Sequence, residues 1–337
     1  MRFRDLFLMG IGALSYKVFK IKKPLNVMFA VTNRCNSSCI YCSIPQRGQE
    51  DLSFDKIVFV FKQLRNAGTV RLGLWGGEPL LREDIGEIID YAKNLGFYTT
   101  LDTNAYLLPE KFKQIRTIDH IVIGFDGPQE IHDFQRGKGS FKKVIEAFKI
   151  LKNTNIPVWT ITVLTKYNLD CIEEILFYAQ KYNFKTTFQV LHHNEFLAKD
   201  YKDLIPSDIK LRQCIQKIIS YKERKYPIAS SFSYLRYLLN WPHYEKTISQ
   251  ERIGNLKCLA GKLYCNIDVT GEIYPCSLLI QKFPAKNIFK EGFKQAFSSL
   301  DSYNCKSCLA SCFVEYNYLF SLHLNTIWQW LRAMPKK

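Results

Sequence analysis

The sequence lacks the features of a membrane-spanning or secreted chain. No window reaches the roughly 20 uninterrupted apolar residues that a spanning helix needs. The first 23 residues place basic flanks around an apolar run of signal-peptide length. However, no small-x-small cleavage site follows, because Gly10, Gly12 and Ala13 lie inside the run. We therefore expect a cytoplasmic protein in a reducing compartment.

Acidic residues are scarce relative to basic ones. The chain has 31 Asp and Glu against 47 Lys and Arg, a net charge of +16, which favours contact with phosphates or anionic lipids. No nucleic-acid recognition motif accompanies this charge, so we expect no nucleic-acid partner, with RNA modification as an alternative. Repeats and low-complexity tracts are absent as well. The length of 337 residues and a hydrophobic content of 47% suffice for a globular core.

The eleven cysteines do not suit a disulfide framework. Their number is odd, and many are separated by only two or three residues, a pattern typical of metal or cluster ligation. Cys171 and Cys214 stand alone in helical patterns and are interpreted as core residues. The others form two groups: Cys35, Cys39 and Cys42, and then Cys258, Cys265, Cys276, Cys305, Cys308 and Cys312.

Apolar runs of strand length alternate with helical patterns up to residue 190. The expected strands are 26–32, 70–75, 98–102, 120–125, 157–164 and 185–190, and the expected helices are 53–67, 81–95, 109–115, 140–152 and 169–182. Six such units predict an α/β fold, a partial (β/α)6 TIM-like barrel whose chemistry lies at the carboxyl ends of its strands. We expect a small cysteine-rich domain built around bound metal to follow.

The remaining segments divide the chain further. We expect an N-terminal amphipathic helix (1–24), the barrel (25–190), a helical bridge (191–257), the cysteine-rich domain (258–312) and a C-terminal amphipathic helix (313–337). Within the bridge, helices are predicted at 208–221 and 231–239, and the last apolar helix is predicted at 313–334.

The first cysteine group directly follows the first expected strand. Soft sulfur ligands select zinc or iron-sulfur clusters over hard cations. Structural zinc requires a fourth Cys or His nearby, whereas a 4Fe-4S cluster with three protein ligands leaves one iron open for a cofactor. A zinc knuckle or three buried thiols remain the alternatives.

The spacing Cys35-x-x-x-Cys39-x-Tyr41-Cys42, together with Gly76-Gly77-Glu78-Pro79 after the second strand, resembles the radical S-adenosylmethionine (SAM) enzymes. The resemblance implies a 4Fe-4S cluster on the three cysteines, with SAM bound to its open iron. Reductive cleavage of SAM then gives a 5′-deoxyadenosyl radical that abstracts substrate hydrogen. We expect the glycines to let the backbone approach the ligand, and the Glu78 carboxylate to pair with the cofactor's ammonium group.

Further positions at successive strand ends resemble the family's cofactor contacts. Thr103 and Asn104 end the third strand, and Asp126 ends the fourth, where Gly124 replaces the family's serine. Arg136 resembles an arginine that commonly reaches the cofactor's carboxylate. Each alone could be a turn residue, but together they predict the mouth of a cofactor site.

The second group resembles the SPASM or twitch region of radical SAM enzymes, which carries auxiliary 4Fe-4S clusters. Cys258-x12-Gly271-x4-Cys276 precedes Cys305-x-x-Cys308-x-x-x-Cys312. We expect one auxiliary cluster on Cys258, Cys276 and two of the last three cysteines, with zinc as the alternative. Cys265 is open between a further ligand and a buried thiol. Ser277 stands where sulfatase-maturing relatives have a carboxylate base, which argues against that activity.

Both termini carry apolar stripes with basic flanks. The stripes contain Phe3, Phe7, Ile11, Leu14 and Val18, and Leu319, Phe320, Leu324, Ile327, Trp328 and Leu331. The flanks contain Arg2, Arg4, Lys17, Lys20, Lys22 and Lys23, and Arg332, Lys336 and Lys337. This pattern is typical of interfacial helices, although both helices could instead pack on the barrel.

Taken together, the sequence predicts a radical SAM enzyme. The expected substrate is a peptide, a small metabolite or a lipid, and the expected reductant is a donor such as flavodoxin or ferredoxin. The alternative from another class is a non-catalytic zinc or iron-sulfur scaffold.

Overall fold

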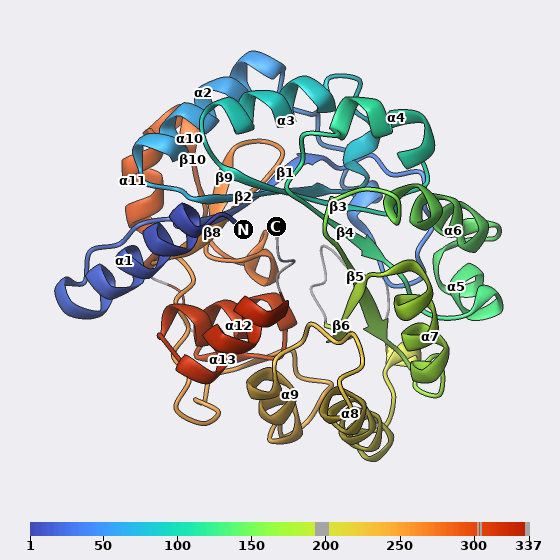
Figure 1. Ribbon diagram of the computed structural model, residues 1–337. Helices are drawn as coiled ribbons and strands as arrows, with labels where there is room; N and C mark the ends of the chain where they lie inside the picture. Colours follow the sequence, from blue (N-terminus) through green and yellow to red (C-terminus); the bar gives the residue numbers. More distant parts are fainter. Residues whose placement is uncertain (193–201, 302, 304, 334–337) are drawn as a thin grey trace.

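Six parallel strands in chain order form the wall of a partial barrel (Figure 1). The computed structural model describes residues 1–192, 202–301, 303 and 305–333. The strands are β1 (Asn26–Thr32), β2 (Arg71–Gly76), β3 (Tyr98–Thr103), β4 (His120–Gly124), β5 (Val158–Leu164) and β6 (Lys185–Val190). Their bounds lie within one residue of the expected ones, and the predicted fold class is confirmed.

Helices cover the outside of this wall (Figure 1). They are α2 (Phe54–Asn66), α3 (Ile85–Asn94), α4 (Leu108–Ile115), α5 (Gln129–Arg136), α6 (Ser140–Leu151) and α7 (Ile172–Tyr182). The N-terminus of α2 is capped by Ser53, whose side chain accepts a hydrogen bond from the Lys56 amide. The sequence analysis missed α5, because only Ile131 and Phe134 among its eight residues are apolar.

The cysteine-rich segment continues the same sheet. Strand β8 (Tyr264–Ile267) pairs in parallel with β1, followed by the antiparallel β9 (Glu272–Tyr274) and β10 (Lys286–Asn287). Two short strands, β7 (Ile248–Ser249) and β11 (Ser307–Cys308), pair separately. Short helices α10 (Ile288–Glu291) and α11 (Phe293–Ser298) lie beside α2, at the left of Figure 1.

The bridge contains α8 (Asp208–Glu223) and α9 (Phe232–Leu239), close to the expected helices. Residues 193–201 of the predicted bridge lie outside the described residues. The division into five segments stays a prediction.

The expectation of one helix over 313–334 is wrong. The chain forms α12 (Ser311–Phe320) and α13 (Leu324–Ala333), and Leu322 between them has a φ of 60°. This left-handed residue turns the chain so that both helices contact α9. The break carries no glycine or proline, so the sequence pattern gave no sign of it. Met334, Lys336 and Lys337 lie outside the described residues.

The N-terminal helix α1 (Phe3–Phe19) precedes β1 and contacts α12. No helix within the described ranges is long and apolar enough to cross a bilayer.

Candidate active site and auxiliary metal pocket

The first cysteine group lies in the loop after β1, and its three side chains are half-buried. The hydroxyl of Ser37 lies 3.2 Å from the Cys39 sulfur, and the Asn104 amide nitrogen lies 3.8 Å from the Cys35 sulfur. Burial is the main cause that raises the pKa of Cys35 and Cys42 to about 11, and nearby negative charge adds to it. Metal binding at these thiols must therefore release their protons.

Gly76 and Gly77 lie directly against the cysteine loop, and their approach to a ligand stays a prediction. A Cβ on Gly76, whose φ is +146°, would lie 2.0 Å from the Thr32 carbonyl oxygen. A Cβ on Gly77 would lie 2.3 Å from that of Arg34. The amides of Gly77 and Glu78 donate to these two carbonyls, each at 2.8 Å. The pair thus fixes the loop against the end of β2.

Glu78 is held by hydrogen-bond donors of the protein, and its expected pairing with the cofactor's ammonium group stays a prediction. Its carboxylate is fully buried and accepts hydrogen bonds from the Thr103 hydroxyl at 2.6 Å and from the amides of Asn104 and Leu80 at 2.7 and 3.0 Å. Burial raises the pKa of Glu78 to about 7, against the effect of these donors. Glu78 therefore ties the end of β2 to the end of β3. Pro79, which follows it, is buried in the next turn.

Asp126 accepts hydrogen bonds from two residues that the sequence analysis singled out, Tyr41 of the cysteine motif and Arg136. It is fully buried, and its Oδ2 accepts from the Tyr41 hydroxyl at 2.7 Å and from Arg136 Nε at 2.6 Å. Its Oδ1 accepts from the Val163 amide of β5 at 2.9 Å. The guanidinium of Arg136 also lies over the Tyr41 ring, 5.7 Å from its centroid. Four sequence-distant segments thus meet at one carboxylate.

Gly124 leaves the space that Arg136 occupies. A Cβ at this position would lie 2.2 Å from Nη1 of Arg136. The nearby loop is tied to Arg136 as well, since its carbonyl accepts from the Ser37 hydroxyl at 2.9 Å. Within the described residues, the two terminal nitrogens of Arg136 donate no hydrogen bond. This arrangement leaves a buried cation with free donors beside the three cysteines, suited to a carboxylate.

We predict that Gly124→Ser displaces the Arg136 guanidinium and weakens SAM binding by roughly 10- to 100-fold, as loss of a group that orients a binding site usually does. Equilibrium dialysis of labelled SAM against the reconstituted protein measures this. Gly10→Ser is the matched control, because nothing lies within 4 Å of a Cβ there. Equal SAM affinity for both variants would contradict the role of Gly124.

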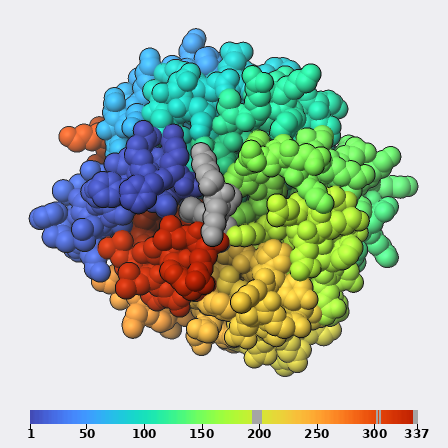
Figure 2. All heavy atoms as spheres, in the orientation of Figure 1, coloured from blue at the N-terminus to red at the C-terminus, as the bar shows by residue number. Residues whose placement is uncertain are grey.

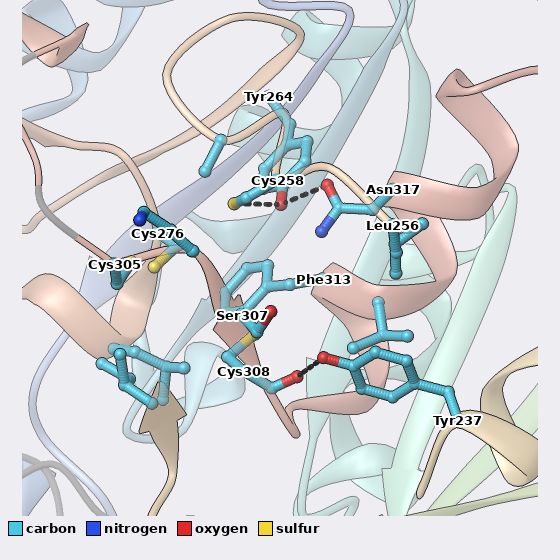
Figure 3. A pocket seen from close by; sticks show the side chains of 15 residues that line it. Tyr237, Leu256, Cys258, Tyr264, Cys276, Cys305, Ser307, Cys308, Phe313 and Asn317 are labelled. Carbon is cyan, nitrogen blue, oxygen red and sulfur yellow. Dashed lines mark hydrogen bonds between the residues drawn. The ribbon is translucent and has the colours of Figure 1, made fainter. Parts of the chain in front are cut away.

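Four cysteines of the second group line one pocket (Figure 3). They come from three segments: Cys258 before β8, Cys276 after β9, and Cys305 and Cys308 around β11. Tyr303 donates to the Cys258 sulfur at 3.6 Å, and the Tyr264 hydroxyl lies 3.7 Å from it. Burial first, and then the charge of neighbouring thiolates, raises the pKa of Cys276, Cys305 and Cys308. Four thiols at one pocket match the donor set of a 4Fe-4S cluster or a zinc ion.

Among the residues that the structure describes, no three His, Cys, Asp or Glu side chains already stand in the geometry of a single metal ion. Two observations support metal binding by the cysteine groups. Thiolates are suitable ligands, and the cysteines of each group share one loop or one pocket.

Cys265 and Cys312 do not join the four. Cys265 pairs with Val27 across β8 and β1 and is buried in the core, because alternate strand residues face opposite sides and its neighbours Tyr264 and Asn266 face inward. Cys312, the second residue of α12, instead faces the barrel cavity, where it is exposed. We predicted that two of the last three cysteines are ligands. Cys305 and Cys308 are the two that line the pocket.

The barrel cavity has a volume of about 260 Å³ and is lined mainly by residues of the barrel strands and of α12. Trp75 and Asp102 line it one residue before Gly76 and Thr103, and Ser277 lines it one residue after Cys276. Phe313 lines both this cavity and the four-cysteine pocket. The cavity is therefore separated from the four-cysteine pocket by Phe313, and two of its lining residues directly precede residues of the first site.

Sequence reasoning missed the polar groups of this cavity. Arg71 lines it and donates to the Tyr316 hydroxyl at 2.7 Å and to Asn26 Oδ1 at 2.6 Å. Burial raises the pKa of Asp102 to about 6, and the charge of Arg71 opposes this. The available signal was strand alternation, which places Tyr98, Thr100 and Asp102 on one side of β3.

A buried ion pair joins the two metal-binding regions. Arg47, just beyond the cysteine loop, donates through Nη1 to Asp268 Oδ1 at 2.9 Å, and its Nη2 contacts Oδ2. Asp268 follows β8 directly. The two side chains are 5% and 1% exposed, so their charges are almost fully withdrawn from water.

We predict that Arg47→Met lowers the free energy of unfolding by about 3–5 kcal/mol, because it leaves the Asp268 carboxylate buried without a partner. Arg34→Met is the control, since Arg34 forms an exposed pair with Asp51 that contributes about 1 kcal/mol or less. Denaturant unfolding of both variants measures the difference. Equal losses would mean that the Arg47 pair is not effectively buried.

The radical SAM superfamily profile matches residues 29–179, which cover β1 through most of α7. Residues 29–179 are a radical SAM domain. This domain, the maturase relative and the SAM-bound structures of similar fold support an enzyme that uses a 4Fe-4S cluster and SAM. The Cys35, Cys39 and Cys42 loop lies inside the matched segment and supplies the donor set that such a cluster needs.

The chain is similar to known radical SAM proteins over most of its length. It is 27% identical over 278 residues to the mycofactocin maturase MftC of Mycolicibacterium smegmatis, covering 80% of this chain and 68% of the relative. Its fold matches SuiB of Streptococcus suis bound to SAM, with a TM-score of 0.68 at 18% identity over 86% of this chain and 69% of SuiB. It also matches anSMEcpe with bound SAM, with a TM-score of 0.66 at 17% identity over 92% and 100% of the two chains.

Proposed function

We propose that this radical SAM enzyme modifies a peptide. The observation that carries the proposal is the barrel cavity, which shares Phe313 with the four-cysteine pocket and is lined by Trp75 and Asp102 near the strand ends that hold the first cysteine loop. The relative MftC is a maturase, and SuiB, of similar fold, has been solved with its precursor peptide SuiA. A small metabolite or a lipid is the alternative occupant of the cavity.

We assign the roles at the first site as follows. Cys35, Cys39 and Cys42 hold the cluster, which supplies the electron that cleaves SAM. The free terminal nitrogens of Arg136 bind the SAM carboxylate, with Asp126 and Tyr41 holding Arg136 in place. Asn104 orients Cys35, and Thr103 with Glu78 fixes the strand ends below it. Gly76, Gly77 and Pro79 position the loop.

At the second site, Cys258, Cys276, Cys305 and Cys308 hold an auxiliary 4Fe-4S cluster that relays electrons or anchors the substrate. The electrons come from a donor such as flavodoxin or ferredoxin. We place the enzyme in the cytoplasm, in contact with a membrane surface.

Anaerobic reconstitution with SAM and a chemical reductant tests the proposal. We expect 5′-deoxyadenosine in the product mixture, and faster formation with short peptides encoded beside the gene, accompanied by a mass change of the peptide. If only small metabolites or lipid extracts raise the rate of 5′-deoxyadenosine formation, the peptide proposal is wrong while the radical chemistry stands.

A further inference from the structure

Helix α1 packs on the barrel through its smallest residues. Gly12 lies so close to Leu25 that a Cβ would be 2.5 Å from the leucine side chain, and Ala13 beside it is buried. Asp5 is also buried and pairs with Arg2 at 2.6 Å. Leu8, Met9 and Tyr16 are partly buried against the core as well, so one side of this helix faces the protein.

The opposite side of α1 is apolar and exposed. Phe3 is 84% exposed, Phe7 58%, Ile11 47%, Leu14 51% and Val18 58%. These side chains recur every three or four residues and so form one stripe along the helix. From the sequence alone, this stripe could also have packed on the barrel. In the described residues it does not pack there. A continuous apolar stripe of this kind marks an interaction surface.

A second apolar strip lies on α13, which packs on α12, and α12 in turn contacts α1. Figure 2 shows the N-terminal helix in blue beside the C-terminal helices in red. Leu324, Trp328 and Leu331 are exposed there, and the Arg332 guanidinium lies 3.3 Å from the centroid of the Trp328 ring. The other members of the C-terminal stripe differ, since Phe320 is buried and Leu319 and Ile327 are half-buried. Leu319 and Phe320 precede the break after α12, whereas Ile327 lies in α13 with the exposed residues.

The charge around α1 decides between possible occupants. Asp5 is the only acidic residue among the first 23, and it is buried, whereas Lys17, Lys20 and Lys22 are exposed. A second copy of the chain would bring the same positive charge, and the two copies would repel each other. An anionic lipid surface supplies both the opposite charge and an apolar layer for the stripe. A helix of 17 residues, roughly 25 Å long, fits lying flat at this boundary.

We propose that α1, assisted by the exposed strip of α13, docks the enzyme flat on a bilayer that contains anionic lipid. The proposed function includes a membrane contact, and this inference says which helices make that contact. It rests on no other part of the proposed function. The radical chemistry does not depend on it, because the stripe residues touch neither cysteine site.

Flotation of the full chain with vesicles tests the docking. We expect the protein to float with vesicles of phosphatidylcholine and phosphatidylglycerol, to float poorly with phosphatidylcholine alone, and to be released by salt. The double variant Phe7→Asp/Leu14→Asp should lower the bound fraction roughly tenfold, because it places two charges in the apolar layer. Phe177→Asp, at an exposed phenyl group on α7, is the matched control and should float like the unchanged chain.

Three results would overturn the proposal. The first is a protein that stays in solution with both kinds of vesicle, and the second is equal loss of flotation in the Phe177 variant. The third is sedimentation of the free protein as a dimer that the Phe7/Leu14 variant dissociates, which would assign the stripe to a second copy. Formation of 5′-deoxyadenosine without vesicles should be equal in all variants, so failed docking is distinguishable from failed radical chemistry.

Discussion

Cys42→Ser will abolish the reductive cleavage of SAM and remove about four of about eight irons per chain. The loop after β1 offers three thiols, so the loss of one leaves two ligands, too few to hold a cluster there. A serine hydroxyl does not replace a thiolate, because it remains protonated at neutral pH and is a hard donor. Iron and sulfide content, together with 5′-deoxyadenosine formation, measure the result.

Cys171→Ser is the matched control for this prediction. Cys171 is half-buried at the start of α7 and lines neither the loop after β1 nor the four-cysteine pocket. We expect full iron content and full SAM cleavage from this variant. A Cys42 variant that keeps all its iron would disprove the assignment of the cluster to the three-cysteine loop.

Cys308→Ser will disrupt the auxiliary site and Cys312→Ser will leave it intact, although only three residues separate the two cysteines. Cys308 lines the four-cysteine pocket, so its replacement should remove about four irons and stop substrate conversion, while SAM cleavage persists. Cys312 faces the barrel cavity, so its replacement should leave the iron content unchanged.

Iron analysis of the two purified variants decides this comparison. If the Cys312 variant loses iron and the Cys308 variant keeps it, the ligand set given by the pocket is wrong. If the metal content is zinc rather than iron, the pocket is a structural zinc site.

The strands of the barrel and the three-cysteine motif were predictable from the sequence. The strands of the barrel are buried apolar runs bounded by turns, so their pattern gives their ends to within one residue. The three-cysteine motif was equally visible, because all its ligands lie within eight residues. In both cases the information is contained in one short stretch of chain.

Contacts between distant segments were not predictable in this way. Nothing in the sequence indicated that the carboxylate of Glu78 accepts hydrogen bonds from donors at the end of β3 and in the next turn. Gly124 departs from the family pattern in the sequence, but only the position of Arg136, on the missed helix α5, explains the departure.

The structure was also needed to show which of the last three cysteines line the auxiliary pocket. The spacing of Cys305, Cys308 and Cys312 allows several ligand pairs. The start of α12 at Ser311 settles their placement, because it turns Cys312 toward the cavity. That start depends on packing against α9 and β6, which no local pattern contains.

The position of β1 in the sheet has a consequence for synthesis. On one side β1 pairs with β2, and on the other with β8, whose residues 264–267 leave the ribosome far later. Until then β1 is an edge strand with unpaired amides and carbonyls, a template for aggregation. Such late pairing between distant residues is slow. A growing chain therefore completes the sheet beside its first cysteine loop only after β8 has been synthesised, and fragments that stop before β8 keep an open edge at that loop.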